Sequence, residues 1–242
     1  MSYQEFRPRS FQTLPLVIKN LLIINILMYA AKVVFAQSLG IDLDKYLGLH
    51  YITASDFKPY QFITYLFMHG DFTHLFFNMF AVWMFGSVLE NTWGAKRFII
   101  YYLVTGLGAA LIQYIVFYFQ IQEVNAQIAN LMQTPGFIAE DNLSLIHQKS
   151  EFLNNLTVIG ASGSLFGLLL AFGMMFPNTL LYVYFLVPVK AKWFVMAYGA
   201  IELISGLRAN PMDNVAHFAH LGGMLFGFIM IMIWKKNRNF YL

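Results

Sequence analysis

Four polar residues that lie in otherwise apolar stretches could carry out chemistry: His74, Asn78, Ser162 and His220. A polar group inside a membrane-spanning segment costs free energy, so each is a candidate functional residue. A serine hydroxyl beside an imidazole is the minimum for nucleophilic acyl transfer, because the imidazole can accept the hydroxyl proton. His74 and Asn78 share one helical face, so both can donate hydrogen bonds to a developing oxyanion.

Glycines near two of these residues favour a close contact between them. Around Ser162, glycine occupies three nearby positions: Gly160, Gly163 and Gly167. In the last apolar stretch, Gly223 and Gly227 lie on the same helical face as His220. Faces without side chains let two helices approach closely, which would bring Ser162 and His220 together. The alternative is an ordinary helix–helix contact through small residues, in which Ser162 only packs.

Other roles for the polar residues remain open. His217 lies three residues before His220 on nearly the same face and is an alternative base. His74 and Asn78 could satisfy each other's hydrogen bonds, or His74 could bind a haem. Glu202 is the one acidic residue within the later apolar stretches and has no evident partner, so the sequence favours a Ser–His dyad over a triad.

The composition indicates that a membrane surrounds these residues. Of the 242 residues, 59% are hydrophobic and 11% are charged, whereas about 25% of residues in a soluble domain are charged. A membrane-spanning helix needs about 20 mostly apolar residues. We expect one all-α domain over residues 1–242 with six spans, at approximately 14–36, 72–89, 98–119, 156–176, 189–204 and 215–234. The absence of cysteine excludes disulfides and thiolate catalysis.

The distribution of basic residues orients this predicted polytopic membrane protein. With the N-terminus in the cytoplasm, ten of the 15 Lys and Arg residues lie on the inner side and five on the outer side. Both termini are therefore expected in the cytoplasm, with the four polar residues at a similar depth below the outer surface. We predict an interfacial, partly buried loop at 37–71 and a polar connection at 120–155. The stretch 180–187 either extends the fifth helix, against which Pro188 argues, or forms a surface turn.

Three short motifs occur in an order and on spans that are typical of one family. The motifs are HLFFN from His74 to Asn78, GASG from Gly160 to Gly163, and AHLGG from Ala219 to Gly223. Together they resemble the three signature motifs of rhomboid intramembrane serine proteases, and the resemblance covers nearly all of the chain. It implies a six-transmembrane-helix rhomboid-like bundle. The family often has Trp-Arg in the first outer loop, where this chain has Tyr60-Gln61.

The resemblance also implies a role for each site residue. Ser162 would be the nucleophile and His220 the general base. The backbone N–H of Ser162, with the side chains of His74 and Asn78, would form the oxyanion hole. Phe166, one helical turn after Ser162, occupies the place of an aromatic residue that often packs on the catalytic imidazole.

The expected function is an intramembrane serine endopeptidase that cleaves transmembrane or juxtamembrane segments of membrane proteins. One alternative is a catalytically weak rhomboid relative that binds membrane clients, and another is a transporter or b-type haem protein that uses the membrane histidines. No cofactor, no metal and no nucleic acid is expected, and a His-Glu-x-x-His zinc motif is absent. The expected partners are membrane-protein substrates and the lipid bilayer, for a multi-pass protein of the bacterial inner (plasma) membrane.

Overall fold

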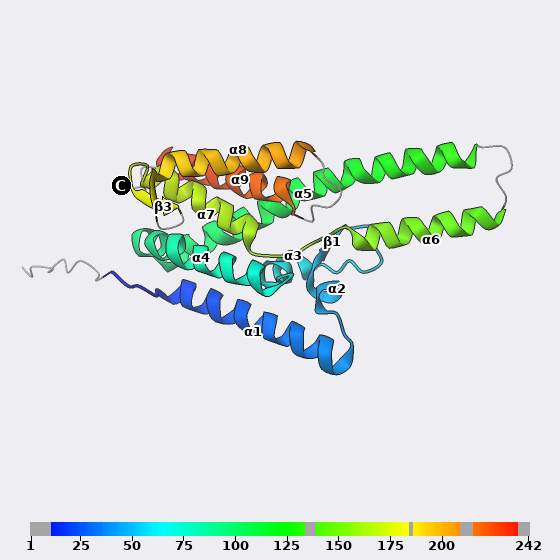
Figure 1. Ribbon diagram of the computed structural model, residues 1–242, viewed down its shortest axis with the longest axis horizontal. Helices are drawn as coiled ribbons and strands as arrows, with labels where there is room; N and C mark the ends of the chain where they lie inside the picture. Colours follow the sequence, from blue (N-terminus) through cyan, green and yellow to red (C-terminus); the bar gives the residue numbers. More distant parts are fainter. Residues whose placement is uncertain (1–10, 134–138, 184–185, 209–214, 237–242) are drawn as a thin grey trace, which may run out of the picture.

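The computed structural model describes residues 11–133, 139–183, 186–208 and 215–236, and this part of the chain is predominantly helical (Figure 1). The helices in chain order are α1 (Leu16–Leu39), α2 (Leu43–Leu47), α3 (Gln61–Thr64), the 3-10 helix η1 (Tyr65–Phe67), α4 (Phe72–Trp93), α5 (Ala95–Met132), α6 (Ala139–Asn155), α7 (Ser162–Met175), α8 (Ala191–Arg208) and α9 (His217–Lys236). Two short antiparallel pairs join β1 (Leu49–His50) to β2 (Thr157–Val158) and β3 (Leu180–Val183) to β4 (Val187–Lys190).

Helix α7 is the centre of the bundle. It contacts α4, α5, α8 and α9, and ten of its 14 residues are buried. Helix α1 lies along one side of the bundle beside α4, and the second half of α5 projects away from the bundle together with α6 (Figure 1). The residue at the start of α7 is therefore held by helices from most of the chain.

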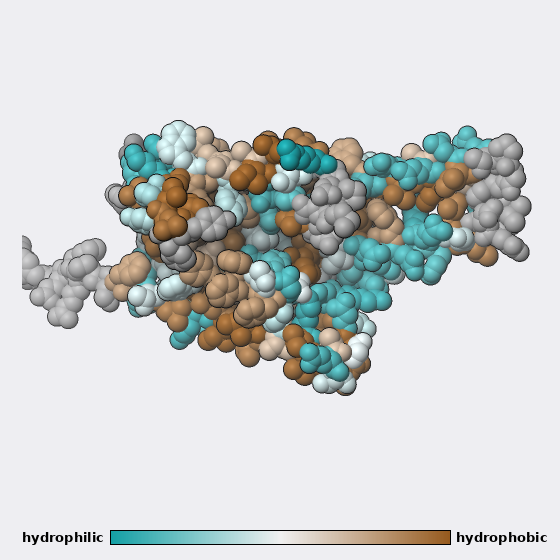
Figure 2. All heavy atoms as spheres, in the orientation of Figure 1, coloured by the Kyte–Doolittle hydropathy of each residue, from teal (hydrophilic) through white to brown (hydrophobic). Residues whose placement is uncertain are grey.

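The outer faces of the long helices are apolar. Within the described residues, four helices are long and apolar enough to cross a membrane: α1, α4, α5 and α9; α7 is apolar but shorter. Large hydrophobic side chains such as Leu27 and Phe77 are more than 60% exposed, and hydrophobic residues cover much of the visible bundle surface (Figure 2). Soluble monomers rarely expose such continuous apolar surface. The prediction of an all-α integral membrane protein is confirmed.

The expected helices correspond to observed ones, but the structure has further helices in both predicted connections. The loop predicted at 37–71 contains α2, α3 and η1, and the connection predicted at 120–155 departs further. Helix α5 continues to Met132, and residues 139–155 form α6, so most of this connection is helical. Its Gln, Asn and Glu residues are compatible with a helix whose exposed faces meet water. The count of six spans stays a prediction. The termini expected in the cytoplasm, residues 1–10 and 237–242, lie outside the described residues.

The chain also departs from the expected pattern on either side of α7. The predicted span at 156–176 begins too early, because Thr157 and Val158 pair with β1 before α7 starts at Ser162. The stretch 180–187 does not extend the fifth helix, because Leu180–Val183 pairs with the next strand, with Pro188 opposite Tyr182. The stretch is instead part of a pair of strands, and residues 184–185 between them lie outside the described residues.

Glycines and one aspartate set the ends of the long helices. Gly40, at φ 64°, ends α1, and Gly94, at φ 79°, separates α4 from α5. A positive φ is strained for residues with a Cβ, so glycine is favoured at both turns. The carboxylate of Asp71 accepts a hydrogen bond from the His74 backbone N–H at 2.8 Å and caps the start of α4. This cap fixes the first turn of α4, which carries His74.

A buried carboxylate ties α1 to α4. The two carboxylate oxygens of Glu90 accept hydrogen bonds from the backbone N–H groups of Val17 and Ile18, each at 2.9 Å. These groups lie in the first turn of α1, where N–H groups have no partner within the helix. Glu90 therefore supplies the cap that Pro15, at the α1 N-cap position, cannot supply.

The predicted loop at 37–71 is partly buried, as expected, and Gln61 organises it. Its side chain is fully buried. Its Oε1 accepts hydrogen bonds from the N–H groups of Lys58 and His50 at 3.1 and 3.3 Å. Its Nε2 donates to the carbonyls of Asp56 and Tyr46 at 2.9 and 3.2 Å. Gln61 thus holds three segments of the loop together.

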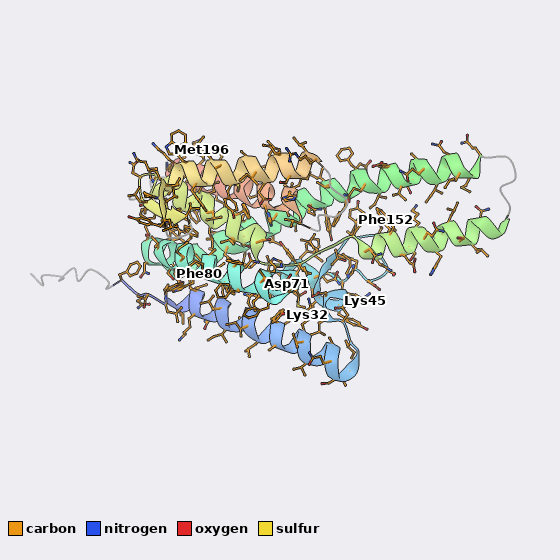
Figure 3. The ribbon with its side chains drawn as sticks, viewed as in Figure 1. Lys32, Lys45, Asp71, Phe80, Phe152 and Met196 are labelled. Atoms are coloured by element: carbon orange, nitrogen blue, oxygen red, sulfur yellow. The ribbon has the colours of Figure 1, made fainter. Side chains whose placement is uncertain are left out.

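Lys32 anchors the end of the same loop to α1. Its ammonium donates hydrogen bonds to the carbonyls of His69 and Gly70, both at 2.8 Å. It also pairs with the carboxylate of Asp44 at 2.5 Å. Lys32 lies beside Asp71 at the end of the bundle that carries α2 (Figure 3). The entry to α4 is therefore held from α1 as well as by its own cap.

We predict that Gln61→Leu lowers the stability of the protein in detergent. The substitution leaves two backbone N–H groups and two carbonyls without their partner, and one buried unsatisfied group costs about 1–3 kcal/mol. The measurement is the thermal unfolding midpoint. The control is Gln127→Leu, the same chemical change at an exposed position of α5. Equal midpoints for the two variants would show that Gln61 does not hold the loop together.

Candidate active site

Ser162 is the first residue of α7, and a glycine turn places it there. Gly160 has φ 115°, which residues with a Cβ rarely adopt, and its N–H donates to the carbonyl of Tyr65 at 2.8 Å. The turn leads directly into α7. Because the first N–H groups of a helix have no partner within it, the backbone N–H of Ser162 is available as a hydrogen-bond donor at the site.

The structure brings Ser162 and His220 into contact. Nε2 of His220 lies 2.8 Å from Oγ of Ser162. The Phe166 ring stacks on the imidazole, with centroids 4.2 Å apart and planes 7° apart, and Phe166 in turn contacts the ring of Tyr198 at 5.8 Å. The imidazole is thus held flat against α7 with one nitrogen facing the hydroxyl. His220 is only 7% exposed, so little water competes for these contacts.

Glycines make this contact possible. A Cβ on Gly223 would lie 1.9 Å from the backbone oxygen of Gly163, so the two backbones touch. A Cβ on Gly227 would lie 2.3 Å from the Tyr101 hydroxyl and 3.4 Å from Cα of Gly167. The Tyr101 hydroxyl itself donates to the Gly167 carbonyl at 2.8 Å. Four of the five glycines singled out in the sequence thus lie where α7 and α9 meet, and the fifth, Gly160, lies in the turn before α7.

His74 lies against the turn that precedes Ser162. A Cβ on Gly160 would lie 3.0 Å from both Cε1 and Nε2 of the His74 ring. The other ring nitrogen, Nδ1, faces the backbone N–H of Gly70 at 3.4 Å. If Nδ1 accepts from that N–H, the ring proton is on Nε2, the nitrogen that faces the site. His74 is therefore oriented as a donor towards the start of α7.

Asn78 lies one turn further along α4, and its side chain is 5% exposed. Its Nδ2 is buried and has no hydrogen-bond partner within the described residues. A buried amide without a partner costs free energy. The alternative that His74 and Asn78 satisfy each other is not supported, since this amide nitrogen is unsatisfied.

The sequence analysis was wrong to leave Glu202 without a partner. Its Oε2 lies 2.8 Å from Nδ1 of His220 and 2.7 Å from Nδ1 of His217. Helix α8 brings this carboxylate to the side of the imidazole opposite Ser162. One signal in the sequence could have found it: a carboxylate in an apolar helix requires a partner, and two histidines three residues apart begin the next helix.

Among the described residues, the same three side chains form a group that could hold a metal ion. One ligand atom from each of Glu202, His217 and His220 lies within 4.8 Å of the others. The two Nδ1 atoms are already within hydrogen-bonding distance of the carboxylate. The arrangement is therefore satisfied by hydrogen bonds alone.

His69 is a second residue that the sequence analysis missed. It is fully buried and contacts the edge of the His74 ring, with centroids 5.0 Å apart. Burial lowers the pKa of His69 to about 3, and the neighbouring His74 acts in the same direction. His69 is thus neutral at physiological pH and supports the His74 ring without adding a charge near the site.

A polar cavity of about 930 Å³ lies next to the site. Its walls include Ile159, just before the Gly160 turn, and Ala216, just before α9. Four acidic residues also line it: Asp42, Asp44, Asp56 and Glu151. Water can therefore come close to the start of α7 although the bundle around it is apolar.

The fold and the site together define an integral membrane protein in which a partly buried serine contacts a buried histidine. Comparison with known proteins gives the family. The rhomboid domain matches residues 56–237, which is most of the chain. The chain belongs to the rhomboid family, as the three motifs predicted.

Individual relatives are distant. The chain is similar to RHOMBOID-like protein 6, mitochondrial, of Arabidopsis thaliana (28% identity over 75% of this chain and 48% of the relative). It is similar to Rhomboid protein 1, mitochondrial, of Saccharomyces cerevisiae (26% identity, 81% and 49%). It is also similar to Rhomboid protease AarA of Providencia stuartii (24% identity, 86% and 68%). The chain thus spans about half to two thirds of the length of these curated relatives.

We predict that Gly223→Ala destabilises the bundle. The new methyl group would meet the backbone oxygen of Gly163, which cannot move aside as a side chain can, so α7 and α9 must separate. Overpacking of this kind costs about 1–3 kcal/mol. The measurement is the thermal unfolding midpoint in detergent. Gly199→Ala is the control, because a Cβ there meets only the end of the Met224 side chain. A midpoint equal to that of the control would show that this contact is not tight.

Proposed function

We propose that this protein is an intramembrane serine endopeptidase. One observation carries the proposal: Oγ of Ser162 lies 2.8 Å from Nε2 of His220, inside a bundle of apolar helices. Ile159 and Ala216, which precede Ser162 and His220 closely in the chain, line a polar cavity, and we propose that the water consumed by hydrolysis comes from it. A protein named as a rhomboid protease is among its relatives, which supports the same activity.

The arrangement fits acyl transfer in two stages. Nε2 of His220 takes the proton from Ser162 while Oγ attacks the peptide carbonyl carbon. The imidazolium then gives this proton to the leaving amine, and an acyl-enzyme ester forms at Ser162. In the second stage His220 takes a proton from water, the hydroxide oxygen attacks the ester carbonyl, and the proton returns to Ser162 as the ester bond breaks.

The oxyanion of each tetrahedral intermediate needs hydrogen-bond donors, because an unpaired charge in an apolar site is costly. Three donors can converge there: the backbone N–H of Ser162, Nε2 of His74 and Nδ2 of Asn78. The last of these is buried and unsatisfied. A donor left without a partner in the resting protein is ready to bind a charge that exists only during the reaction.

The substrate in this proposal is a transmembrane or juxtamembrane segment of another membrane protein, which enters the bundle from the bilayer. We place six spans on α1, α4, α5, α7, α8 and α9, with both termini in the cytoplasm as the basic residues favour. We propose that the protein resides in the bacterial inner membrane. Relatives named as mitochondrial are equally similar, so this last point rests on the sequence analysis alone.

The second candidate is a rhomboid relative that binds membrane clients with little catalysis. It is the weaker candidate, because such a protein has no need of a serine hydroxyl aligned with an imidazole. A haem protein would need histidines that face one cavity as paired axial ligands, whereas Nε2 of His220 faces Ser162.

We predict that a serine-directed fluorophosphonate labels the intact protein and that Ser162→Ala abolishes both labelling and cleavage of a purified membrane-protein substrate. His220→Ala should abolish cleavage too, and the double variant should be no worse, because the two residues act as a unit. His217→Ala should retain substantial activity. An inactive His217→Ala variant together with an active His220→Ala variant would show that His217 is the general base. Cleavage by Ser162→Ala would refute the proposed function.

A further prediction concerns the oxyanion donors. His74→Ala and Asn78→Ala should each fold, stay reactive towards the fluorophosphonate and cleave slowly, because losing one donor typically costs about 10²–10³ in rate. The cleavage rates of both single variants and of the double variant on one substrate measure this. Phe77→Ala, a change between them on an exposed part of α4, is the control. Wild-type rates in the double variant would leave the two residues as a structural pair.

A further inference from the structure

Helix α8 contributes a carboxylate that the dyad mechanism does not use. Glu202 is 7% exposed, and a carboxylate at such a position in an apolar bundle is costly unless it is paired. Its Oε2 lies 2.7 Å from His217 Nδ1 and 2.8 Å from His220 Nδ1. One oxygen therefore connects two residues on nearly the same face of α9 to α8.

The direction of these hydrogen bonds follows from the chemistry of the groups. An ionised carboxylate can only accept, so Nδ1 of His220 carries a proton and donates it. Nε2 of the neutral ring is then the acceptor, which is the form required to receive a proton from Ser162. Ser162, His220 and Glu202 form a continuous chain of two 2.8 Å contacts in this order.

We propose that Glu202 is a positioning residue that holds His220 in the base-competent tautomer and stabilises the imidazolium formed during catalysis, and that His217 holds the Glu202 carboxylate in place. This inference rests on the proposed function. The site is then a Ser–His–Glu triad built from α7, α9 and α8. Phe166 fixes the plane of the imidazole by stacking, and Glu202 fixes its rotation within that plane.

Within the part of the chain that the structure describes, few other ionisable groups face His220. On its own helix the neighbour is His217, and on α4 it is His74, which interacts with His220 electrostatically. Helix α7 contributes Ser162 and Phe166, and α5 meets this part of α9 through Ala109 and Ile112, which contact Gly222. Among these groups, only Glu202 carries a negative charge that can balance the imidazolium.

The test compares Glu202→Gln, Glu202→Asp and the intact protein by kcat, KM and the pH dependence of kcat/KM on one purified substrate. Glu202→Gln should lower kcat by about 10²-fold with little change in KM, within the range for an impaired general base. In the Glu202→Gln variant, the acid limb of the kcat/KM pH profile should move to lower pH by about 1–3 units, because the imidazolium loses its counter-charge. Glu202→Asp keeps the negative charge. The acid limb of its pH profile should lie close to that of the intact protein, and its kcat should be higher than that of Glu202→Gln.

The matched control is Glu90→Gln, which neutralises an equally buried carboxylate that caps α1 far from Ser162 along α4. It should lower the thermal midpoint and leave the acid limb in place. A purely structural Glu202 would behave in the same way, so an unmoved acid limb in Glu202→Gln overturns the inference. An acid limb in Glu202→Asp that moves as far as in Glu202→Gln also overturns it.

Removal of metal ions tests the remaining alternative, in which Glu202, His217 and His220 bind a metal ion. The intact protein should keep its cleavage rate after exhaustive treatment with EDTA. A loss that added Zn²⁺ restores would make the three side chains a metal site and overturn the inference. An intact protein that neither cleaves nor takes up the fluorophosphonate would instead refute the proposed function, so the two failures are distinguishable.

Discussion

The backbone contact between α7 and α9 is the constraint on which the site depends. Ser162 lies at the beginning of one helix and His220 near the beginning of the other, so their separation is set by how closely the helices approach. With Gly223 against the Gly163 carbonyl, the two backbones meet without side chains between them. In a bilayer, water gives no hydrophobic force between helices, and close packing of small residues takes its place. Catalytic geometry and bundle stability therefore depend on the same glycines.

Polar groups in this bundle are arranged in pairs that keep their cost low. Glu90 satisfies two N–H groups at the start of α1, and Glu202 satisfies two imidazoles. The ammonium of Lys32 likewise donates hydrogen bonds to two carbonyls and pairs with a carboxylate. At the site, the amide nitrogen of Asn78 and both ring nitrogens of His69 are buried without a hydrogen-bond partner within the described residues. For Asn78 this fits the proposed role, because a donor that binds only the transition state has no partner in the resting protein.

Sequence reasoning predicted the elements that carry strong local signals. Apolar length marked α1, α4 and α9, and glycine spacing after Ser162 and His220 marked the faces that meet. It failed where the outcome depends on tertiary contacts or on polar helices. The end of α5 and all of α6 lack the apolar pattern that indicates a span, so the sequence predicts a polar connection there. Gln61 looked like a departure from a family motif, and its four hydrogen bonds could not be seen without the fold of the loop around it.

The partner of Glu202 was missed for a related reason. Nothing in the local sequence says which face of α8 meets α9, since α8 has exposed apolar residues on several sides. The cost of a lone carboxylate in lipid nevertheless requires some partner, and histidines at 217 and 220 are the polar groups that open the following helix. An intramembrane carboxylate without a local partner is thus evidence for a tertiary contact with the nearest polar cluster in the chain. For Glu202 the nearest polar cluster includes His220, the proposed general base, so the charge that pairs with α9 at this point is also placed to stabilise the imidazolium.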